Sequence, residues 1–372
     1  MNEEIYSPGL EGVTAGETAI STIAGGLQYR GYSIEDLASH ASFEEVAYLL
    51  LYGELPKAEE LAALQARLGE AAVVPAELLD FLRHIPATAG TMDVMRTAAS
   101  ALAHWDPDVE DNGNAANLRK AERLTAQLPV ILAARHRMLH GLEPVAADKH
   151  LSLAGNLLWM LNGEKPTPRA TQAMNVSLIM YAEHEYNAST FTARVVVSTL
   201  SDLHSGVTAA IGALKGPLHG GANERVLEVL ERVGSADKAE AWIRAALERK
   251  ERIMGFGHRV YKTGDPRAVI LKVLCGELAV ETGHQEMEAI ADTIETIVRT
   301  EKKLPPNLDW PSARLYHYLN LPVSLYTPLF VVSRVVGWSA HICEQLANNR
   351  LIRPRARYTG PAERAWVAVE KR

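Results

Sequence analysis

The sequence contains only two cysteines, Cys275 and Cys343, among 372 residues. Neither lies in a CxxC or mixed Cys/His ligand spacing, so we expect neither a disulfide framework nor a metal site. Positive charge is also scarce, since 38 lysines and arginines face 45 acidic residues and give a net charge of −7. A general nucleic-acid-binding surface is therefore not expected.

The chain also lacks an obvious targeting or membrane segment. Residues 1–4 (MNEE) have no basic region followed by an apolar stretch, so no secretory signal is visible. The most apolar late stretch, residues 321–343, is interrupted by two prolines and by Arg334, which a plain membrane span would not contain. With so few cysteines, a reducing cytoplasmic location fits best.

Length and periodicity predict a helical protein of two domains. A chain of 372 residues suggests about two domains at ~150 residues each. Apolar residues recur at the three- and four-residue spacing of amphipathic helices. This spacing is clearest in residues 61–68 behind Pro56, in 242–247 behind a candidate cap at Ser235, and in 287–298 before Pro305-Pro306. One or two short strands are expected only within residues 12–31, and the predicted fold class is all-α.

Basic residues gather in two places despite the negative net charge. Residues 244–272 contain eight lysines and arginines against three acidic residues, and residues 350–372 contain seven against two. These excesses favour a compact anionic ligand, although any one of the side chains could equally lie on a solvated helix face.

Two histidines and one aspartate stand in glycine- and proline-rich loops. His219 precedes a helix predicted to start near Asn223, and a helix dipole there would favour the neutral imidazole, which can donate to a forming enolate. His258 follows two glycines that would let a ligand approach the backbone. Asp309 is a candidate general base, with Ser312 expected to cap the next helix. Taken singly, all three also fit ordinary turn or capping residues.

Four longer blocks carry a resemblance that decides between these readings. They are residues 183–194 (EHEYNASTFTAR), 216–224 (GPLHGGANE), 254–262 (MGFGHRVYK) with 265–268 (DPRA), and 352–355 (IRPR). In content and order they resemble the blocks of citrate synthases, and the resemblance runs from about residue 9 to 360. The chain has the length of the shorter bacterial and archaeal form.

The resemblance implies a reaction and a role for each matching residue. It implies condensation of acetyl-CoA with oxaloacetate and water, with no permanently bound cofactor. Asp309 would remove a proton from the acetyl methyl, His219 would stabilise the enol, and His258 would polarise the keto carbonyl. The residues implied to hold oxaloacetate are His184, Arg267, Arg334 and, reaching across a homodimer from the partner subunit, Arg353. Arginine forks suit the two carboxylates of that substrate.

The resemblance also implies where coenzyme A binds and how the chain divides. The nucleotide would lie against the backbone of Gly255, Phe256 and Gly257 with Lys262 near phosphate, and Asn307 would contact the pantetheine arm. A small helical domain, residues 222–320, would close over a large domain made of residues 1–221 and 321–372. Closure would exclude water until the carbon–carbon bond forms.

The sequence around the candidate base Asp309 leaves open which acyl-CoA is the substrate. Residues 306–313 are PNLDWPSA. The Asn-Leu-Asp-Trp motif in them is similar to the motif at this place in 2-methylcitrate synthases, which use propionyl-CoA. An apolar pocket distinguishes one methyl group by only about 1–3 kcal/mol, so dual activity is a further alternative. A non-catalytic helical protein that binds CoA, a dicarboxylate or a partner is the hypothesis from another class. A metal-dependent hydrolase is disfavoured.

Overall fold

Helices make up nearly all of the regular structure. This computed structural model describes residues 6–258, 261 and 263–372. Within them lie sixteen α-helices and three strands of two residues each, β1 (Ser21–Thr22), β2 (Gln28–Tyr29) and β3 (Tyr32–Ser33). The strands form one antiparallel sheet in the order β1-β2-β3. The all-α prediction is confirmed, and the sheet has one strand more than expected.

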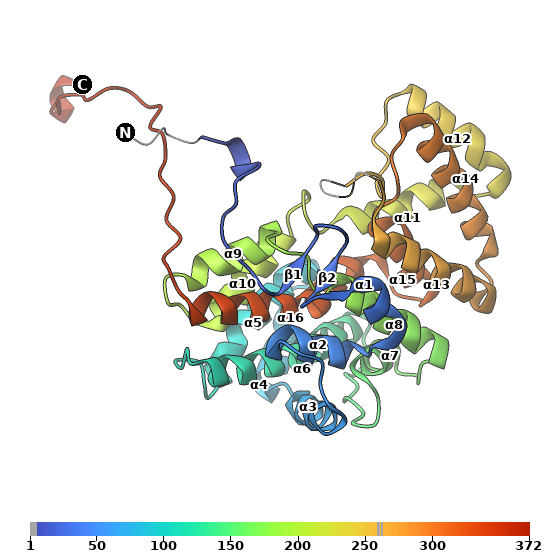
Figure 1. Cartoon of the computed structure of the whole chain (residues 1–372), viewed down its shortest axis with the longest axis horizontal. Coiled ribbons are helices and arrows are strands. Elements are labelled where there is room, and N and C mark those ends of the chain that lie inside the picture. The colour runs from blue at the N-terminus through green and yellow to red at the C-terminus, as the bar shows by residue number, and fades with distance from the viewer. Residues whose placement is uncertain (1–5, 259–260, 262) are drawn as a thin grey trace.

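Most helices belong to one large group, in which the last long helix returns to pack among the first ones (Figure 1). Its members are α1 (Ile34–His40), α2 (Phe43–Tyr52), α3 (Ala58–Ala71), α4 (Ala76–His84), α5 (Thr91–Ala101), α6 (Asn114–Leu139), α7 (Leu153–Asn162), α8 (Pro168–Tyr181), α9 (Ala188–Val197), α10 (Leu203–Leu214) and α16 (Tyr326–Ala347). Short 3-10 helices are η1 (Pro8–Leu10), η2 (Leu102–Trp105), η3 (Val323–Leu325) and η4 (Val369–Lys371).

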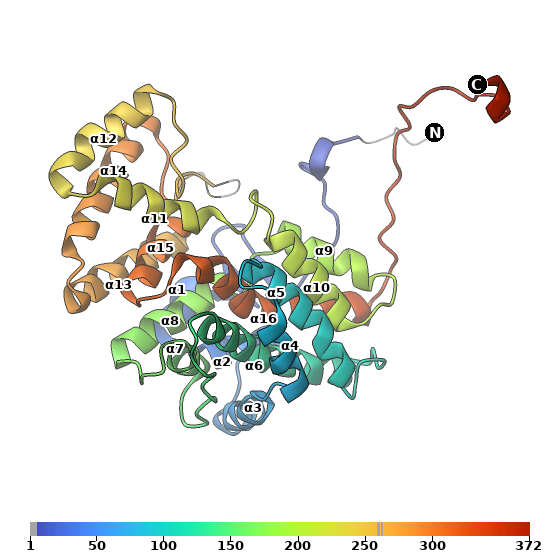
Figure 2. The same cartoon turned by 180° about the vertical axis from the view of Figure 1, so that it is seen from behind.

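The remaining five helices gather at one side of the molecule (Figures 1 and 2). They are α11 (Ala222–Val233), α12 (Ala236–Glu248), α13 (Pro266–Thr282), α14 (Gln285–Lys302) and α15 (Asp309–Tyr318). Helix α12 packs on α14, and both α11 and α13 pack on α15, while α13 also contacts α1 and α8 of the large group.

The predicted apolar stripes become the buried faces of three helices. Leu64 and Leu68 are buried on α3, and Ile243 is buried on α12. Helix α14 buries its isoleucines and ends at Lys302, before Pro305, because proline cannot continue a helix. Periodicity alone therefore located these elements correctly.

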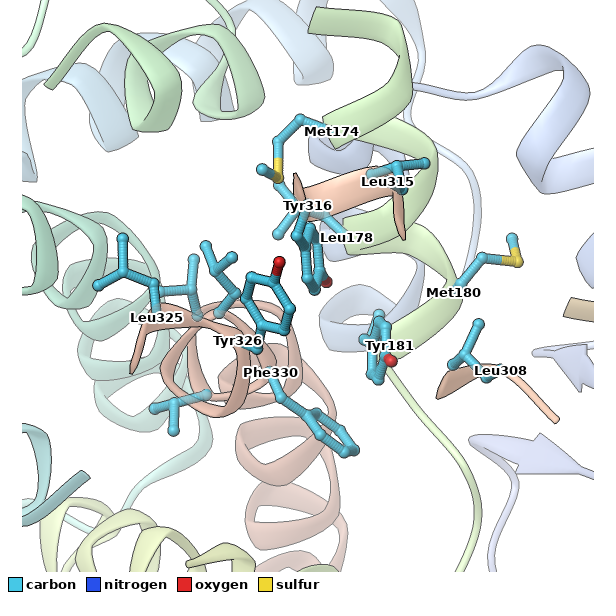
Figure 3. Packing of buried hydrophobic residues seen from close by; sticks show 14 of the residues in the cluster. Met174, Leu178, Met180, Tyr181, Leu308, Leu315, Tyr316, Leu325, Tyr326 and Phe330 are labelled. Carbon is cyan, nitrogen blue, oxygen red and sulfur yellow. The ribbon is translucent and has the colours of Figure 1, made fainter. Parts of the chain in front are cut away.

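Helix α16 runs through the core. Every residue from Tyr326 to Cys343 is buried, and α16 packs against α2, α6, α8, α9 and α10. No helix in the described ranges is both long and apolar enough to cross a membrane. Figure 3 shows where α8, α15 and α16 meet, with the ring of Tyr181 beside that of Phe330 and the ring of Tyr316 beside that of Tyr326. This junction carries the candidate site.

The C-terminal tail, residues 349–372, leaves the body of the molecule after α16. Figures 1 and 2 show it extending away from the helices on the same side as the N-terminal segment. In the first half of the tail, the guanidinium of Arg357 lies 4.8 Å from the ring centre of Tyr6. Tyr358 and Trp366 expose 78% and 81% of their surface, so their apolar rings are largely open to solvent.

Candidate active site

Asp309 is the first residue of α15 and lies at the junction of α8 and α15. Its backbone N–H donates to Oδ1 of Asn307 at 3.0 Å, and its Oδ1 accepts a hydrogen bond from the hydroxyl of Tyr181 at 3.2 Å. Burial raises the pKa of Asp309 to about 6, although the Tyr181 hydrogen bond and the charge of Arg267 oppose the rise. The result is a carboxylate of increased basicity.

The expected capping role of Ser312 is wrong. Helix α15 begins three residues earlier, at Asp309, with Leu308 at the N-cap. Pro311 does not prevent this because the first four N–H groups of a helix have no intrahelical acceptor, so a missing one costs nothing. Ser312 is instead fully buried inside the first turn, where its Oγ lies 2.7 Å from the Tyr181 hydroxyl.

His219 lies in the loop before α11, held against the start of α9. Its Nε2 lies 2.8 Å from Oγ of Ser189 and also accepts from the Ser189 backbone N–H at 3.4 Å. Burial lowers the pKa of His219 to about 4, with a smaller contribution from the charge of Arg334. The neutral imidazole expected from the sequence is therefore present, but burial rather than the helix dipole is its main cause.

His184 and His258 lie side by side. Their ring centres are 5.4 Å apart, and Nε2 of His184 lies 3.1 Å from the hydroxyl of Tyr261. The Tyr261 backbone N–H donates to Nδ1 of His258 at 3.3 Å. The pKa of His184 lies well below its ordinary value, mainly because the ring is buried and also because of the charges of Arg267 and Arg334. Tyr261 thus joins the two histidines.

Two of the predicted arginines are buried beside these rings. Arg267 forms an ion pair with Asp265 at 2.9 Å, which raises the pKa of Arg267 even though burial opposes its charge. Arg334 donates through Nε to the carbonyl of Tyr181 at 2.6 Å. Burial lowers the pKa of Arg334 to about 10, and its buried Nη1 has no hydrogen-bond partner among the described residues.

Aromatic residues connect these groups into one site. The ring of Phe330 lies 4.6 Å from that of Tyr181 and 6.0 Å from that of His219, and the Arg334 guanidinium lies 4.7 Å from its centre. The structure therefore brings the residues predicted from separate loops together. The connecting residues were missed, and the only sequence signal for Phe330 is its position one helical turn before Arg334.

The sequence matches the family described as "Citrate synthase, C-terminal domain" over residues 9–355. The chain belongs to the citrate synthase family. It is 51% identical over 366 residues to "Citrate synthase 2" of Bacillus subtilis, covering 98% of both chains. It is 44% identical to a 2-methylcitrate synthase of Shewanella oneidensis, covering all of this chain and 99% of the other.

The fold agrees with that of a family member whose structure has been solved. The Thermoplasma acidophilum citrate synthase, in a ternary complex with carboxymethyl coenzyme A and oxaloacetate, has a TM-score of 0.92 and 36% identity over 99% of each chain. The family, the fold class and the identification as an enzyme are therefore confirmed.

The turn at Gly255–Gly257 is held against the loop before α15. Gly257 donates its N–H to the carbonyl of Pro305, and the N–H of Asn307 donates to the carbonyl of Gly255. The Asn307 side chain donates to the carbonyl of Gly257 at 2.9 Å. Both glycines have positive φ angles, and a Cβ on Gly255 would lie 2.9 Å from the Trp310 ring. These glycines serve the packing of the turn itself.

The remaining predicted residues are not part of this described group. Lys262 falls outside the described residues. Arg353 is exposed in the C-terminal tail, which runs away from the body of its own chain (Figure 1). In the basic run 244–272, Arg244 and Arg249 form ion pairs with glutamates on the surface, whereas Arg267 is buried in the site. That the run serves a compact anionic ligand therefore stays a prediction, and these two surface ion pairs do not support it for Arg244 and Arg249.

A cavity of about 580 Å³ lies elsewhere, between α3, α6 and α7. None of the predicted site residues lines it. Its lining includes Glu44, Leu68, Pro129 and Asn156. It is therefore separate from the group that contains Asp309 and the three histidines.

Proposed function

We propose that the protein condenses acetyl-CoA with oxaloacetate and water to give citrate and free coenzyme A. Membership of the citrate synthase family supports the reaction class. The observation that carries the proposal is the combination of a partly buried carboxylate, Asp309 with its pKa raised to about 6, and a neutral His219 in one connected group. These are the two groups that enolisation of a thioester needs.

In the first step Asp309 takes a proton from the acetyl methyl group. With a pKa of about 6, this carboxylate is mostly ionised at pH 7 yet more basic than an ordinary aspartate. The forming enolate oxygen must be stabilised as the proton leaves, and a donor placed in a dry site achieves this best.

The hydrogen bonds of His219 support its role as that donor. The Ser189 backbone N–H is an obligatory donor and points at Nε2 of His219, so Nε2 is the acceptor. A neutral imidazole that accepts through Nε2 carries its proton on Nδ1. Nδ1–H is then the group that donates to the thioester oxygen.

In the second step the enol carbon attacks the keto carbon of oxaloacetate. We propose that His258 polarises that carbonyl, while His184, Arg267 and Arg334 hold the substrate. Nη1 of Arg334, which has no partner in the described part of the chain, supports this because a buried guanidinium N–H gains most from a carboxylate acceptor. Hydrolysis of citryl-CoA then releases citrate and the thiol.

Coenzyme A is proposed to lie along residues 255–257, with Lys262 and Asn307 near its phosphate and pantetheine parts. Asn307 would act mainly by holding the turn, since its side chain already donates to Gly257. Residues 222–320 are proposed to move as a small domain over the large domain, residues 1–221 and 321–372.

The active enzyme is proposed to be a homodimer in which each subunit supplies Arg353 to its partner. The C-terminal tail extends away from its own body and exposes the rings of Tyr358 and Trp366. Apolar side chains presented in this way are typical of a segment that packs on another chain. A cytoplasmic location remains our proposal.

A second candidate function is 2-methylcitrate synthesis from propionyl-CoA. It is favoured by the Asn-Leu-Asp-Trp motif at residues 307–310 and by the 44% identity to the 2-methylcitrate synthase of Shewanella oneidensis. The two activities differ by one methyl group in the acyl pocket, so one site can support both.

The test is thiol release from acetyl-CoA and from propionyl-CoA, each with and without oxaloacetate. We expect oxaloacetate-dependent release with a higher kcat/KM for acetyl-CoA; a higher value for propionyl-CoA would favour the second function. Asp309→Asn should lower kcat by roughly 10²–10⁴-fold. Release that does not depend on oxaloacetate, or an Asp309→Asn variant with normal turnover, would refute the proposed chemistry.

A further inference from the structure

The segment that carries His184 is a short connection between α8 and α9, clamped on both sides of that residue. The Glu183 backbone N–H donates to the hydroxyl of Tyr29 at 3.2 Å, and this hydroxyl donates back to the Glu183 carbonyl at 2.9 Å. On the other side, Glu185 adopts a left-handed conformation with φ 53°. A non-glycine residue keeps such a conformation only where its surroundings enforce it.

Ser21 and the Glu183 side chain hold Glu185 in this left-handed conformation. The Glu185 backbone N–H donates to Oγ of Ser21 at 3.0 Å, and the Ser21 hydroxyl donates to Oε1 of Glu183 at 3.0 Å. The carboxylate of the residue before His184 is thus linked to the backbone of the residue after it. The position of this carboxylate therefore helps to fix the backbone conformation of the turn that carries the His184 side chain.

His341, on α16, fixes that carboxylate. Its Nε2 lies 2.8 Å from Oε1 of Glu183, and both side chains are completely buried. Arg194, on α9, donates to Nδ1 of His341 through Nε at 2.9 Å and through Nη2 at 2.8 Å. Because Nδ1 accepts from a guanidinium, the proton of the imidazole lies on Nε2 and is donated to Glu183.

The charges agree with this arrangement. Burial alone would raise the pKa of Glu183, but His341, the charge of Arg334 and the Ser21 hydrogen bond together hold it below its ordinary value. Glu183 is thus a buried carboxylate that stays ionised. Arg194 is in turn held by Glu344 and Gln345, and its guanidinium lies 4.6 Å from the ring centre of Tyr186.

His341 belongs to one face of α16 that already serves the site. Arg334 lies seven residues before His341 and donates to the carbonyl of Tyr181. Trp338, on the same face, donates through Nε1 to Oγ of Ser189 at 3.0 Å, and Ser189 contacts His219. Residues three, four and seven apart share one side of a helix. A single face of α16 therefore contacts both Glu183, which precedes His184, and Ser189, which contacts His219.

We propose that His341, oriented by Arg194, is a positioning residue for His184. It acts through the Glu183 carboxylate and Ser21 and does not itself touch substrate. The proposal rests on the proposed function in one respect, that His184 binds oxaloacetate. An imidazole displaced by about 1 Å can cost on the order of 10²-fold in binding or turnover, so loss of His341 should weaken oxaloacetate binding.

The test compares His341→Leu, which removes both ring nitrogens, with His341→Gln, whose amide can still donate to Glu183 and accept from Arg194. Oxaloacetate binding to each full-length variant is measured by titration calorimetry, and KM for both substrates is measured by thiol release. We expect His341→Leu to raise the oxaloacetate Kd and KM by roughly 10- to 100-fold and the acetyl-CoA KM by less than about threefold. His341→Gln should recover most of the loss.

His204 provides the matched control. It is also buried on a helix and paired with a carboxylate, Asp106, at 3.0 Å, but it lies in a different network. His204→Leu should lower Tm as much as His341→Leu does, yet leave the oxaloacetate Kd unchanged. Should His341→Leu fail to fold, His341→Asn, which is too short to bridge Glu183 and Arg194, takes its place.

The outcomes separate the two proposals. Equal oxaloacetate Kd values for wild type and the His341 variants, or equal losses in the His204 and His341 variants, would overturn the positioning role. A wild-type protein that binds oxaloacetate but releases no thiol would refute the proposed function, while the calorimetric comparison of variants would still decide the role of His341.

Discussion

The hydroxyl of Tyr181, at the end of α8, donates a hydrogen bond to Oδ1 of Asp309, 3.2 Å away at the start of α15. Tyr181 is buried, and burial raises its pKa well above the ordinary value, so the hydroxyl keeps its proton and can donate at neutral pH. A donor of this kind favours the ionised carboxylate. The bond therefore limits how far burial can raise the pKa of the proposed base.

Replacing Tyr181 by phenylalanine removes that limit. The pKa of Asp309 should rise from about 6, since the remaining burial favours the protonated acid. Because the base must be ionised to act, kcat/KM falls as pH drops through this pKa, and the acidic limb of the profile should move to higher pH. A hydrogen bond worth about 1 kcal/mol corresponds to a movement of somewhat less than one pH unit. The measurement is kcat/KM for acetyl-CoA between pH 5 and 9.

Tyr316→Phe is the control for this experiment. Tyr316 is also buried and lies beside Tyr326 (Figure 3), but its hydroxyl bonds to Oγ of Ser177 at 2.8 Å and not to Asp309. Its loss should leave the acidic limb in place. An unmoved limb in Tyr181→Phe, or the same movement in both variants, would show that Tyr181 does not tune the base.

Gly337 lets α16 approach the segment that carries His184. A Cβ added there would lie 2.3 Å from both the carbonyl oxygen of Ala182 and Oε2 of Glu183, in the completely buried region. Neither atom can move freely, so we expect Gly337→Ala to destabilise the fold by at least about 1–3 kcal/mol. It should also raise the KM for oxaloacetate, because the displaced residues, Ala182 and Glu183, immediately precede His184.

Gly276, within α13, is the matched substitution. A Cβ there meets nothing within 4 Å, so Gly276→Ala should stabilise the protein by about 0.5–1 kcal/mol through helix propensity. Urea denaturation of both variants gives the free energies of unfolding. The close-approach argument fails if Gly337→Ala unfolds at the wild-type urea concentration.

The sequence was sufficient to locate several helices, and the structure brings together most of the polar side chains that the sequence singled out. Helical periodicity depends on local spacing, so stripes such as Ile290 and Ile294 on α14 could be predicted without tertiary information. The start of α15 could not, because Pro311 is compatible both with a loop and with a first helical turn. Ser312 was therefore assigned to a cap when it is buried beside Tyr181.

The connecting residues could not be predicted for a different reason. Tyr181, Phe330 and Trp338 have the spacing and composition of ordinary core positions, and they are indeed buried. Their second role depends on where a single polar atom or ring face points after folding. His341 likewise acquires its partners from positions 147 and 158 residues away in the chain. Such relationships exist only in three dimensions.

Arg353 provides a test of the proposed dimer. The residue is exposed in the C-terminal tail, which points away from its own body, whereas Asp309 belongs to helix α15 of the body. If Arg353 serves the partner's site, each of the homodimers Asp309→Asn and Arg353→Ala lacks one group in both sites. A mixed dimer of the two variants then contains one complete site, formed by Asp309 of the Arg353→Ala subunit and Arg353 of the Asp309→Asn subunit.

Co-expression with two different affinity tags yields such mixed dimers for assay of thiol release. We expect about half of the wild-type kcat per dimer, since one of two symmetric sites is intact, while each parent homodimer stays far below this level. If Arg353 acted within its own chain, no site in the mixed dimer would contain both groups and activity would stay at the level of the parents. A mixed dimer as inactive as the Asp309→Asn homodimer would therefore disprove exchange of Arg353 between subunits, whereas recovery requires it.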